Sequence, residues 1–447
     1  MKNVSQYNFV LADCLKKKGS KFGFWHKRYC GLTTSQLIVS KSESFKVPER
    51  IIDITPKTQI EFEKRDRMPR FHIMPENERP ICLASDDLDL IMKWTNELRN
   101  ITLQTPDINM DCFDIISVLG RGYYGKVMLC KKKNTEEYYA IKTVHKNRLV
   151  KSNKVHTVFT ERNVLMKARH PFIVNICFTF QTDSKVYLGL EYVAGGELFH
   201  HLQKKGRLPL SEVRLYVAEL SLAINYLHVL HIIYRDLKPE NVLLDLQGHV
   251  KLTDFGLAKS LQEFESSTGT FCGTSEYLAP EIILKQQYGP MIDWWAIGIL
   301  TYELLFGETP FYHQNKSQMF HAILHAQPRF PRKTDKDTIN FITGLLQKDP
   351  NKRFDFDNIM KHKFFNGMDF NDVLARKYQP EFVPTSKNPV ASNFDTEYTM
   401  ENPQDSLATP APFADGAFDG FSMIAGYEPS DSSDVIEDLG NMSATLM

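Results

Sequence analysis

The sequence lacks the features that mark secreted, zinc-bound and membrane-spanning chains. Its seven cysteines are scattered over 447 residues without a CxxC pair, which excludes a disulfide framework and a structural zinc site. The stretch MKNVSQYNFVLADC at the N-terminus lacks the apolar core of a signal peptide. The most apolar run, WWAIGILTYELLFG, is short and contains Glu303. These absences predict a cytoplasmic protein with reduced thiols.

The chain also lacks a net charge, but its charges are unevenly distributed. Residues 1–104 and 105–382 each carry +5, whereas residues 383–447 carry −10. An acidic tail can be attracted to its own chain. Within this tail the stretch GAFDGFSMI holds Phe418 and Phe421, and a solvated segment gains nothing from exposing two such rings. We therefore expect a pocket elsewhere in the chain to receive them.

The hydrophobic pattern divides the chain into parts. Residues 1–104 show short strand patterns and then the run DDLDLIMKWTNELRNI, in which Leu90, Trp94 and Leu98 recur at helical spacing. This pattern is typical of a small α+β domain closed by one helix. Three strand patterns follow from Phe113, and helical patterns predominate from about residue 197. After Phe365 the composition becomes that of a tail.

Three glycines form a phosphate-binding candidate. Gly120, Gly122 and Gly125 make a G-x-G-x-x-G pattern, with Val127 following. A dinucleotide-binding fold would place them between a strand and a helix, but KVMLCKKK continues as another strand. The glycines are therefore expected to form a hairpin that covers phosphate groups.

A lysine and a glutamate are expected to pair beside this hairpin. Lys142 ends the motif Ala140-Ile141-Lys142 on the next strand, from which its ammonium can reach the same phosphates. Glu161 lies in HTVFTERNVLMKARHPFIV, where the apolar period predicts a helix beside the sheet. Alone, each residue is most often a solvated surface group. An ion pair between them would give both a function.

The stretch IIYRDLKPENVLL concentrates the chemistry. It brings Asp236, Lys238 and Asn241 within six residues, and Asp254 begins the later motif DFG. Phosphoryl transfer needs a carboxylate that orients the hydroxyl and accepts its proton, together with hard oxygen ligands for Mg²⁺. Asp236 fits the first role, and Asn241 and Asp254 fit the second. Lys238 can neutralise charge on the transferred group.

These motifs resemble those of the AGC group of protein serine/threonine kinases. The triplet YRD at 234–236, the motif KPEN and the segment TFCGTSEYLAPE at 270–281 are similar to the catalytic loop and activation segment of that group. Residues 1–104 resemble a pleckstrin-homology (PH) domain, and the combination is similar to the protein kinase B (Akt) family. Ser275 departs from that family, which has proline there.

The resemblance implies an α+β fold with two folded parts. A PH-like β-barrel with a closing helix is expected first, followed by a bilobal kinase fold with a β-rich small lobe, a helical large lobe and an AGC C-terminal tail. The expected boundaries are 1–104 for the PH-like domain, 105–112 for a linker, 113–365 for the catalytic domain, 366–427 for the tail and 428–447 for an acidic disordered end.

The resemblance also implies an activity and partners. It implies an ATP- and Mg²⁺-dependent enzyme that transfers the γ-phosphate to Ser/Thr in basic, Arg-x-x-Ser/Thr-type protein substrates, within phosphoinositide-linked signalling. Upstream activating kinases, recruitment from the cytoplasm to the plasma membrane, a monomeric state and no nucleic-acid partner are implied with it. The alternative is a catalytically inactive, lipid-binding pseudokinase scaffold.

Further site residues follow by resemblance. The residues implied to join the glycines, Lys142 and Glu161 in the ATP site are Leu119, Val127, Ala140, Glu191, Val193 and Asn241. Glu197, Glu240 and Glu303 match positions that hold substrate arginines, and Thr274 is implied to lie near Asp236 and to favour a Ser/Thr acceptor. Glu281 and Arg353 are implied to form a structural ion pair.

Phosphorylation is implied in three places. Thr270 lies in the activation segment, and Ser422 follows the hydrophobic motif Phe418-Asp-Gly-Phe421. The turn-motif site is either Ser406, by its distance from Phe394, or Thr409, which precedes a proline. Phe394 itself matches an aromatic residue that approaches the nucleotide.

The hydrophobic motif answers the question raised by the two tail phenylalanines. In AGC kinases this motif docks beside the helix that carries the equivalent of Glu161, and docking would hold Glu161 against Lys142. A phosphate on Ser422 would strengthen docking through charge-assisted hydrogen bonds, with Gln181 as its implied partner.

Basic residues surround the first hairpin of the PH-like segment, KKKGSKFGFWHKRY. Lys17 and Arg28 match the phosphoinositide-binding pattern, but His26 holds a position that is basic in that pattern. These three residues are the expected lipid site. A solvated basic face or a protein-binding surface is the alternative.

Overall fold

The structure is a computed structural model that describes residues 9–19, 24–33, 35–55, 58–63, 68–75, 78–102, 108–260, 275–385, 391–409 and 416–424. The chain divides into two compact units: the described residues up to Met110 form one together with Ser422–Ile424, and those from Asp111 to Phe421 form the other. Within these ranges, no helix combines the length and the apolar character needed to cross a membrane.

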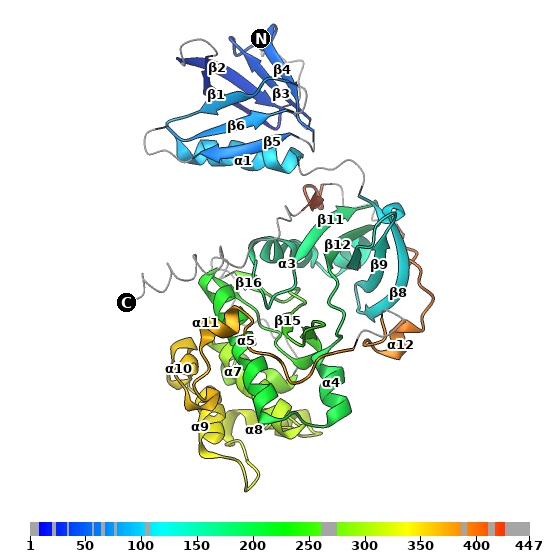
Figure 1. Ribbon diagram of the computed structural model, residues 1–447, viewed down its shortest axis with the longest axis vertical. Coiled ribbons are helices and arrows are strands. Elements are labelled where there is room, and N and C mark those ends of the chain that lie inside the picture. Colours follow the sequence, from blue (N-terminus) through cyan, green and yellow to red (C-terminus); the bar gives the residue numbers. More distant parts are fainter. Residues whose placement is uncertain are drawn as a thin grey trace. The chain divides into compact units, whose positions relative to one another are not determined.

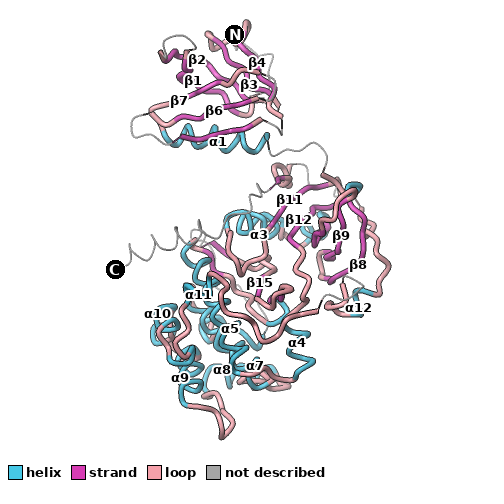
Figure 2. Tube along the Cα trace, viewed as in Figure 1, coloured by secondary structure: helices cyan, strands magenta, loops and turns pink. Residues whose placement is uncertain are grey.

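The N-terminal unit is an antiparallel sheet covered by one helix (Figures 1 and 2). Its seven strands lie in the order β4-β3-β2-β1-β7-β6-β5. In this order the described strands leave β4 and β5 as sheet edges, so the expected closed barrel is not confirmed. The elements are β1 (Leu11–Lys18), β2 (Trp25–Leu32), β3 (Gln36–Ser40), β4 (Pro48–Asp53), β5 (Gln59–Glu63), β6 (Arg70–Met74), β7 (Ile81–Ala84) and α1 (Leu88–Thr102).

Helix α1 packs on this sheet through the apolar positions that its sequence predicted. Trp94 and Leu98 are fully buried, and Leu90 packs at the edge of the same core. The ring of Trp94 stacks on Phe71 with 6.4 Å between centroids. Its indole nitrogen donates to Asp13 at 2.9 Å, which satisfies the one polar atom of a buried side chain.

The second unit begins with a small lobe in which strands β11, β12, β10, β9 and β8 are neighbours in that order. The turn between β9 and β10 contains Asn134, whose positive φ of 62° is tolerated by asparagine. The elements are β8 (Phe113–Arg121), β9 (Gly125–Lys132), β10 (Tyr138–His145), α2 (Lys146–Lys151), α3 (Val155–Lys167), β11 (Ile176–Gln181) and β12 (Lys185–Glu191).

The large lobe is helical and surrounds α7 (Met291–Phe306), which is apolar on nearly all sides because neighbouring helices cover it. Gly307 ends α7 in the left-handed region, and its N–H donates to the carbonyl of Glu303 at 2.7 Å. The other elements are α4 (Leu198–Lys205), α5 (Leu210–Val229), β13 (Ile232–Ile233), β14 (Val242–Leu244), β15 (Val250–Leu252), β16 (Lys259–Ser260), α6 (Pro280–Ile283), α8 (Lys316–His325), α9 (Lys336–Leu345), α10 (Phe356–Met360) and α11 (Phe370–Leu374).

The expected structural ion pair of the large lobe is confirmed. Arg353 Nη1 lies 2.7 Å from Glu281 Oε1, and a second contact of 3.0 Å joins Nη2 to Oε2. Both residues are buried, so their bidentate geometry compensates the loss of hydration.

The tail returns to the small lobe. Helix α12 (Thr396–Thr399) contacts β8 (Figure 1). Two lysines of the small lobe then bind the tail. Lys126 donates to the carbonyl of Gln404, and Lys185 lies 2.7 Å from Asp405. A short strand, β17 (Met423–Ile424), ends the described residues.

Candidate active site

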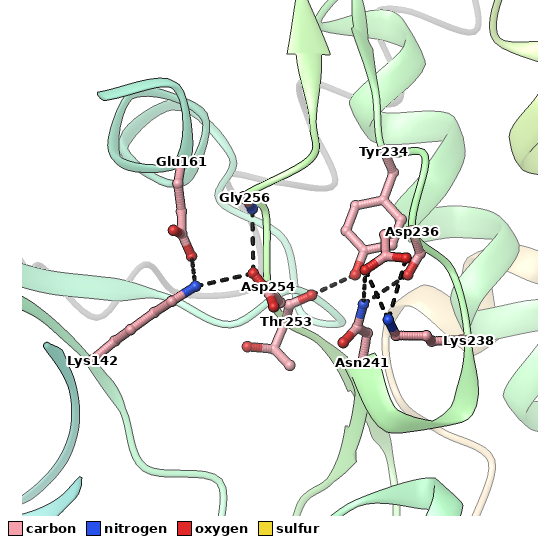
Figure 3. Close-up of polar contacts among 9 residues, drawn as sticks. All are labelled: Lys142, Glu161, Tyr234, Asp236, Lys238, Asn241, Thr253, Asp254 and Gly256. Atoms are coloured by element: carbon pink, nitrogen blue, oxygen red, sulfur yellow. Dashed lines mark hydrogen bonds and ion pairs between the residues drawn. The ribbon is translucent and has the colours of Figure 1, made fainter. Parts of the chain in front are cut away.

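An ion-paired lysine lies at the centre of the site (Figure 3). Lys142 on β10 lies 2.6 Å from Glu161 on α3 and 3.0 Å from Asp254, which follows β15. Burial alone would lower the pKa of Lys142, but the charges of Asp254 and Glu161 outweigh it and raise this pKa. The charge of Lys142 lowers the pKa of Asp254 in turn. The site therefore holds a fixed ammonium beside an ionised carboxylate.

The catalytic-loop residues converge on Asp236, as Figure 3 shows. Lys238 Nζ lies 3.1 Å from Asp236 Oδ2, and Asn241 Nδ2 donates to the same oxygen at 2.8 Å. Burial raises the pKa of Asp236, partly opposed by Lys238. A carboxylate with a raised pKa and fixed orientation suits the acceptance of a hydroxyl proton.

A buried aspartate that the sequence analysis missed holds this loop. Asp293 on α7 accepts from the backbone N–H groups of Tyr234 and Arg235, both at 2.9 Å. Arg235, whose φ is 71°, donates through Nε to the carbonyl of Leu257 at 2.6 Å. Asp293 therefore stabilises the turn that aims Asp236, and Arg235 ties this turn to the segment after Asp254.

The expected glycine hairpin is present between β8 and β9. The N–H of Gly122 donates to the carbonyl of Gly125 at 2.9 Å. A Cβ added at Gly125 would lie 1.7 Å from the carbonyl oxygen of Thr143, so only glycine fits there. A Cβ at Gly120 or Gly122 would meet no atom within 4 Å. This space allows a phosphate to approach the main chain.

An apolar cluster that includes a tail residue adjoins the hairpin. Phe394 is 7% exposed and packs with Leu119, and Val127 and Ala140 lie at the edge of the same cluster. Tyr192 stacks on Phe394 with 6.0 Å between ring centroids. The predicted nucleotide-binding side chains and the predicted tail aromatic thus lie together.

The expected hinge residues begin at the last residue of β12, Glu191. Val193 is buried. The carboxylate of Glu191 accepts from Asn175 at 2.8 Å and from Lys251 at 2.7 Å. Adenine recognition through the main chain of Glu191 and Val193 stays a prediction, whereas the side-chain contacts of Glu191 were not foreseen.

Three glutamates expected to bind substrate influence one another electrostatically. Burial and then the charge of Glu240 raise the pKa of Glu197 to about 7. Burial raises the pKa of Glu303 to about 6, with Glu240 again adding to the shift and a hydrogen bond from Tyr277 opposing it. Glu240 therefore acts on both of the other carboxylates, and Asp395 and Glu276 add to the negative potential around them.

The structure describes only some of the expected regulatory residues. Thr270 and Thr274 lie outside the described residues. The hydroxyl of Ser406 lies 2.9 Å from His145 Nε2, whereas Thr409 is exposed and accepts from Asn147 at 3.3 Å.

The predicted pocket for the tail phenylalanines lies on the small lobe. Phe418 and Phe421 are 3% and 0% exposed. Phe159 on α3 contacts both rings, with centroid distances of 6.4 Å and 5.4 Å. Arg162 donates to the carbonyl of Phe421 at 3.0 Å, and Thr179 donates to the same oxygen at 2.6 Å. The pocket therefore binds both the rings and the main chain of the motif.

Gln181 also contacts the main chain of this motif. Its amide nitrogen donates to the carbonyl of Phe418 at 3.0 Å, and its amide oxygen accepts from Lys146 at 2.7 Å. Ser422 is exposed. Binding of a Ser422 phosphate by Gln181 stays a prediction.

In the N-terminal unit, the expected lipid-site residues lie on neighbouring strands. Lys17 pairs with His26 in the register of β1 and β2. The side chains of Lys17 and Arg28 both bind Glu49, each at 2.5 Å, and His26 is exposed. Glu49 is therefore a counter-ion that the sequence analysis did not identify.

A glycine hairpin, a fixed ammonium and a proton-accepting carboxylate arranged in this way define the class of the protein: its fold and site are those of a protein kinase. Residues 113–365 match the protein kinase domain family, and the chain belongs to it.

Three similar proteins give the group. The chain is 37% identical over 431 residues to a "RAC family serine/threonine-protein kinase homolog" of Dictyostelium discoideum, covering 93% of this chain and 97% of the relative. It is 42% identical over 339 residues to mouse serine/threonine-protein kinase Sgk2, covering 74% and 92%. It is 41% identical over 339 residues to Schizosaccharomyces pombe gad8, covering 74% of this chain and 60% of the relative. The chain is a serine/threonine protein kinase of the AGC type.

Kinases of this family use ATP with Mg²⁺, and the residues present fit both. Asp254 offers an ionised carboxylate. Because Asn241 donates through its nitrogen to Asp236, its amide oxygen is the atom that would bind the metal. Bound Mg²⁺ would neutralise phosphate charge. The pseudokinase alternative gains no support, since Lys142, Asp236 and Asp254 are all in place.

Proposed function

We propose that this kinase phosphorylates Ser/Thr in protein segments that carry arginine upstream of the acceptor, in an Akt-like, phosphoinositide-linked pathway. The observation that carries the proposal is that the charge of Glu240 contributes to the raised pKa of both Glu197 and Glu303. A guanidinium would relieve this repulsion through paired hydrogen bonds. Peptides that differ only in upstream arginines test it directly, since the proposal requires a lower KM for the arginine-containing peptide.

We expect the preference for arginine to be lost at low pH. Glu197 and Glu303 have pKa values raised to about 7 and about 6, so they take up protons as the pH falls from 8 to 6. Protonation removes negative charge, and the KM of an arginine-containing peptide should then rise. The measurement is kcat/KM for peptides with and without upstream arginine at each pH. Their ratio cancels the titration of Asp236, which affects both.

The matched variants are Glu197→Gln and Glu303→Gln. Each should lower the ratio at pH 8 by about tenfold and flatten its pH dependence, because an ionic partner is replaced by a neutral one. A ratio that is independent of pH in wild type, or unchanged in both variants, would contradict arginine recognition at this site. Phosphate transfer to either peptide would still report an active kinase.

We infer that residues 1–104 form a PH-type domain that binds phosphoinositides and recruits the kinase from the cytoplasm to the plasma membrane. The convergence of Lys17 and Arg28 on one carboxylate supports an anion site. Phe24 and Val47 are 68% and 82% exposed, on the connections that follow β1 and β3. Exposed apolar side chains near cations suit the surface of an anionic membrane.

Substitutions at this site should change lipid binding in opposite directions. Lys17→Gln and Arg28→Gln should each weaken binding to vesicles that contain phosphoinositides by about tenfold, because each removes a cation. Glu49→Gln should strengthen binding, because the ligand no longer competes with a carboxylate. Cosedimentation with vesicles measures both effects.

The control is Lys93→Gln, which removes an exposed lysine from α1. It should leave vesicle binding unchanged. If Lys93→Gln weakens binding as much as Lys17→Gln does, the attraction is a diffuse charge effect and no defined site exists.

We propose Ser406 as the turn-motif phosphorylation site. Its hydroxyl adjoins His145, and Lys185 donates to its carbonyl. A phosphate on Ser406 would lie close to the cation of Lys185, whereas the described side-chain contact of the exposed Thr409 is with the neutral amide of Asn147. Phosphopeptide mass spectrometry of the active kinase distinguishes the two sites.

A further inference from the structure

Behind the predicted adenine-binding segment, three polar contacts meet on one oxygen. Glu191 Oε1 accepts from the backbone N–H of Asn175 at 2.8 Å and from the Asn175 side chain at 3.1 Å. It also accepts from Lys251 Nζ at 2.7 Å. Lys251 is 8% exposed, and the surroundings that bury it strengthen its attraction to the carboxylate.

These contacts join elements of both lobes. Glu191 ends β12 of the small lobe, and Asn175 directly precedes β11. Lys251 lies on β15 of the large lobe, three residues before Asp254. Lys251 also donates to the carbonyl of Ile173 at 3.4 Å.

The chain before Asn175 is itself attached to β15. The N–H of Leu252 donates to the carbonyl of Phe172 at 2.8 Å, and the N–H of Val174 donates back to the carbonyl of Leu252 at 2.9 Å. This main-chain ladder supports the segment that carries Asn175. It extends to Glu191, because the N–H of Glu191 donates to the carbonyl of Asn175 at 2.9 Å. Among the described contacts of the Glu191 side chain, the one that comes directly from β15 is the ion pair with Lys251.

We propose that Lys251 is a positioning residue for the phosphoryl-transfer reaction. Through Glu191 it holds the hinge at a fixed distance from the strand that leads to Asp254. The adenine-binding main chain and the metal-binding carboxylate are thereby kept at a fixed distance from each other.

The consequence is preorganised nucleotide binding. ATP must contact the hinge at one end, and its phosphates must reach Asp254 and Lys142 at the other. Without the Lys251–Glu191 ion pair, main-chain hydrogen bonds alone would hold Glu191 to the chain beside β15, and the two lobes would sample other relative arrangements more often. The observed dissociation constant rises as the fraction of molecules in the binding-competent arrangement falls.

The test compares Lys251→Met with Lys251→Arg in the full chain. Lys251→Met keeps the length of the side chain and removes its charge, and it should raise the KM for ATP and the Kd for ADP about three- to tenfold. Lys251→Arg keeps the charge and should recover most of the affinity. Lys377→Met is the matched control, because it removes an exposed lysine that pairs with Asp372 at 2.7 Å away from the hinge. It should leave both constants unchanged.

A double-mutant cycle separates positioning from loss of stability. Glu191→Gln should raise the KM for ATP in the same way, and combining it with Lys251→Met should add little, since one interaction is being removed twice. Additive effects would overturn the proposal. So would a KM for ATP within twofold of wild type in a Lys251→Met protein that unfolds cooperatively. If Lys251→Met does not fold, the KM for ATP of Glu191→Gln is compared with that of wild type instead. A difference of less than twofold would then overturn the proposal.

Discussion

Replacing Asp236 with asparagine should abolish phosphate transfer and leave nucleotide binding intact. Asparagine keeps the size of the side chain and an oxygen that can accept from Lys238 and Asn241. It cannot accept the proton of the attacking hydroxyl. Loss of a positioned general base costs about 10²- to 10⁴-fold in rate. We expect a fall of about 10³-fold in kcat, measured with an arginine-containing serine peptide and phosphorylated enzyme.

Two comparisons make this result specific. The Kd for ADP should stay within twofold of wild type, because Asp236 is not among the residues that hold the nucleotide. Asp245→Asn is the matched control, since Asp245 also pairs with a cation, Arg376, but lies in the turn after β14. It should retain activity. Transfer by Asp236→Asn at more than a tenth of the wild-type rate would assign the base to another residue.

The sequence predicted much of the chemistry because short motifs fix short-range geometry. Asp236, Lys238 and Asn241 lie in one loop, so their contacts follow from local spacing. The pairing of Lys142 with Glu161 was also predicted, because a strand and the adjacent helix have few ways to pack. The glycine hairpin followed from the strand pattern on both of its sides.

The residues that support this chemistry were not predictable in the same way. Asp293 lies 58 residues from the N–H of Arg235 that it binds, and Lys251 lies 60 residues from Glu191. A lone aspartate or lysine in a helix or strand pattern is most often a solvated residue. Only the folded arrangement brings such pairs together. The burial of a charged side chain would have been the signal, and burial of one polar residue cannot be read from a single sequence.

Arg162 shows the same limit and carries a mechanistic consequence. It follows Glu161 on α3, so the same helix binds the tail through Arg162 and Lys142 through Glu161. The guanidinium also lies 5.4 Å from the centroid of the Phe421 ring. Docking of the tail therefore stabilises the position of α3 that keeps Glu161 in its ion pair.

Replacing Phe421 with alanine should consequently inactivate the kinase without touching the reacting groups. The side chain of Phe421 is fully buried, with Phe159 and Arg162 against its ring, and Thr179 donates to its carbonyl. Truncating a buried phenylalanine costs about 3–5 kcal/mol, and a short docked segment has few other contacts to offset this loss. The tail should leave its pocket, and the population with Glu161 held against Lys142 should fall. We expect kcat/KM to drop at least about tenfold.

Rescue in trans and a matched control decide whether docking is the cause. A peptide with the sequence GAFDGFSMI should restore most of the activity of Phe421→Ala, and it should fail on the same variant that also carries Arg162→Ala. Leu407→Ala removes a fully exposed apolar residue of the same tail and should leave activity unchanged.

Ser422→Ala should lower kcat/KM less than Phe421→Ala does, because the described contacts of the motif come from its rings and carbonyl oxygens. If Ser422→Ala is instead the more damaging substitution, a phosphate is the dominant anchor and the carbonyl contacts are secondary. Failure of the peptide to rescue a folded Phe421→Ala protein would mean that the buried ring supports the small lobe itself, and the coupling of tail to Lys142 through α3 would have to be given up.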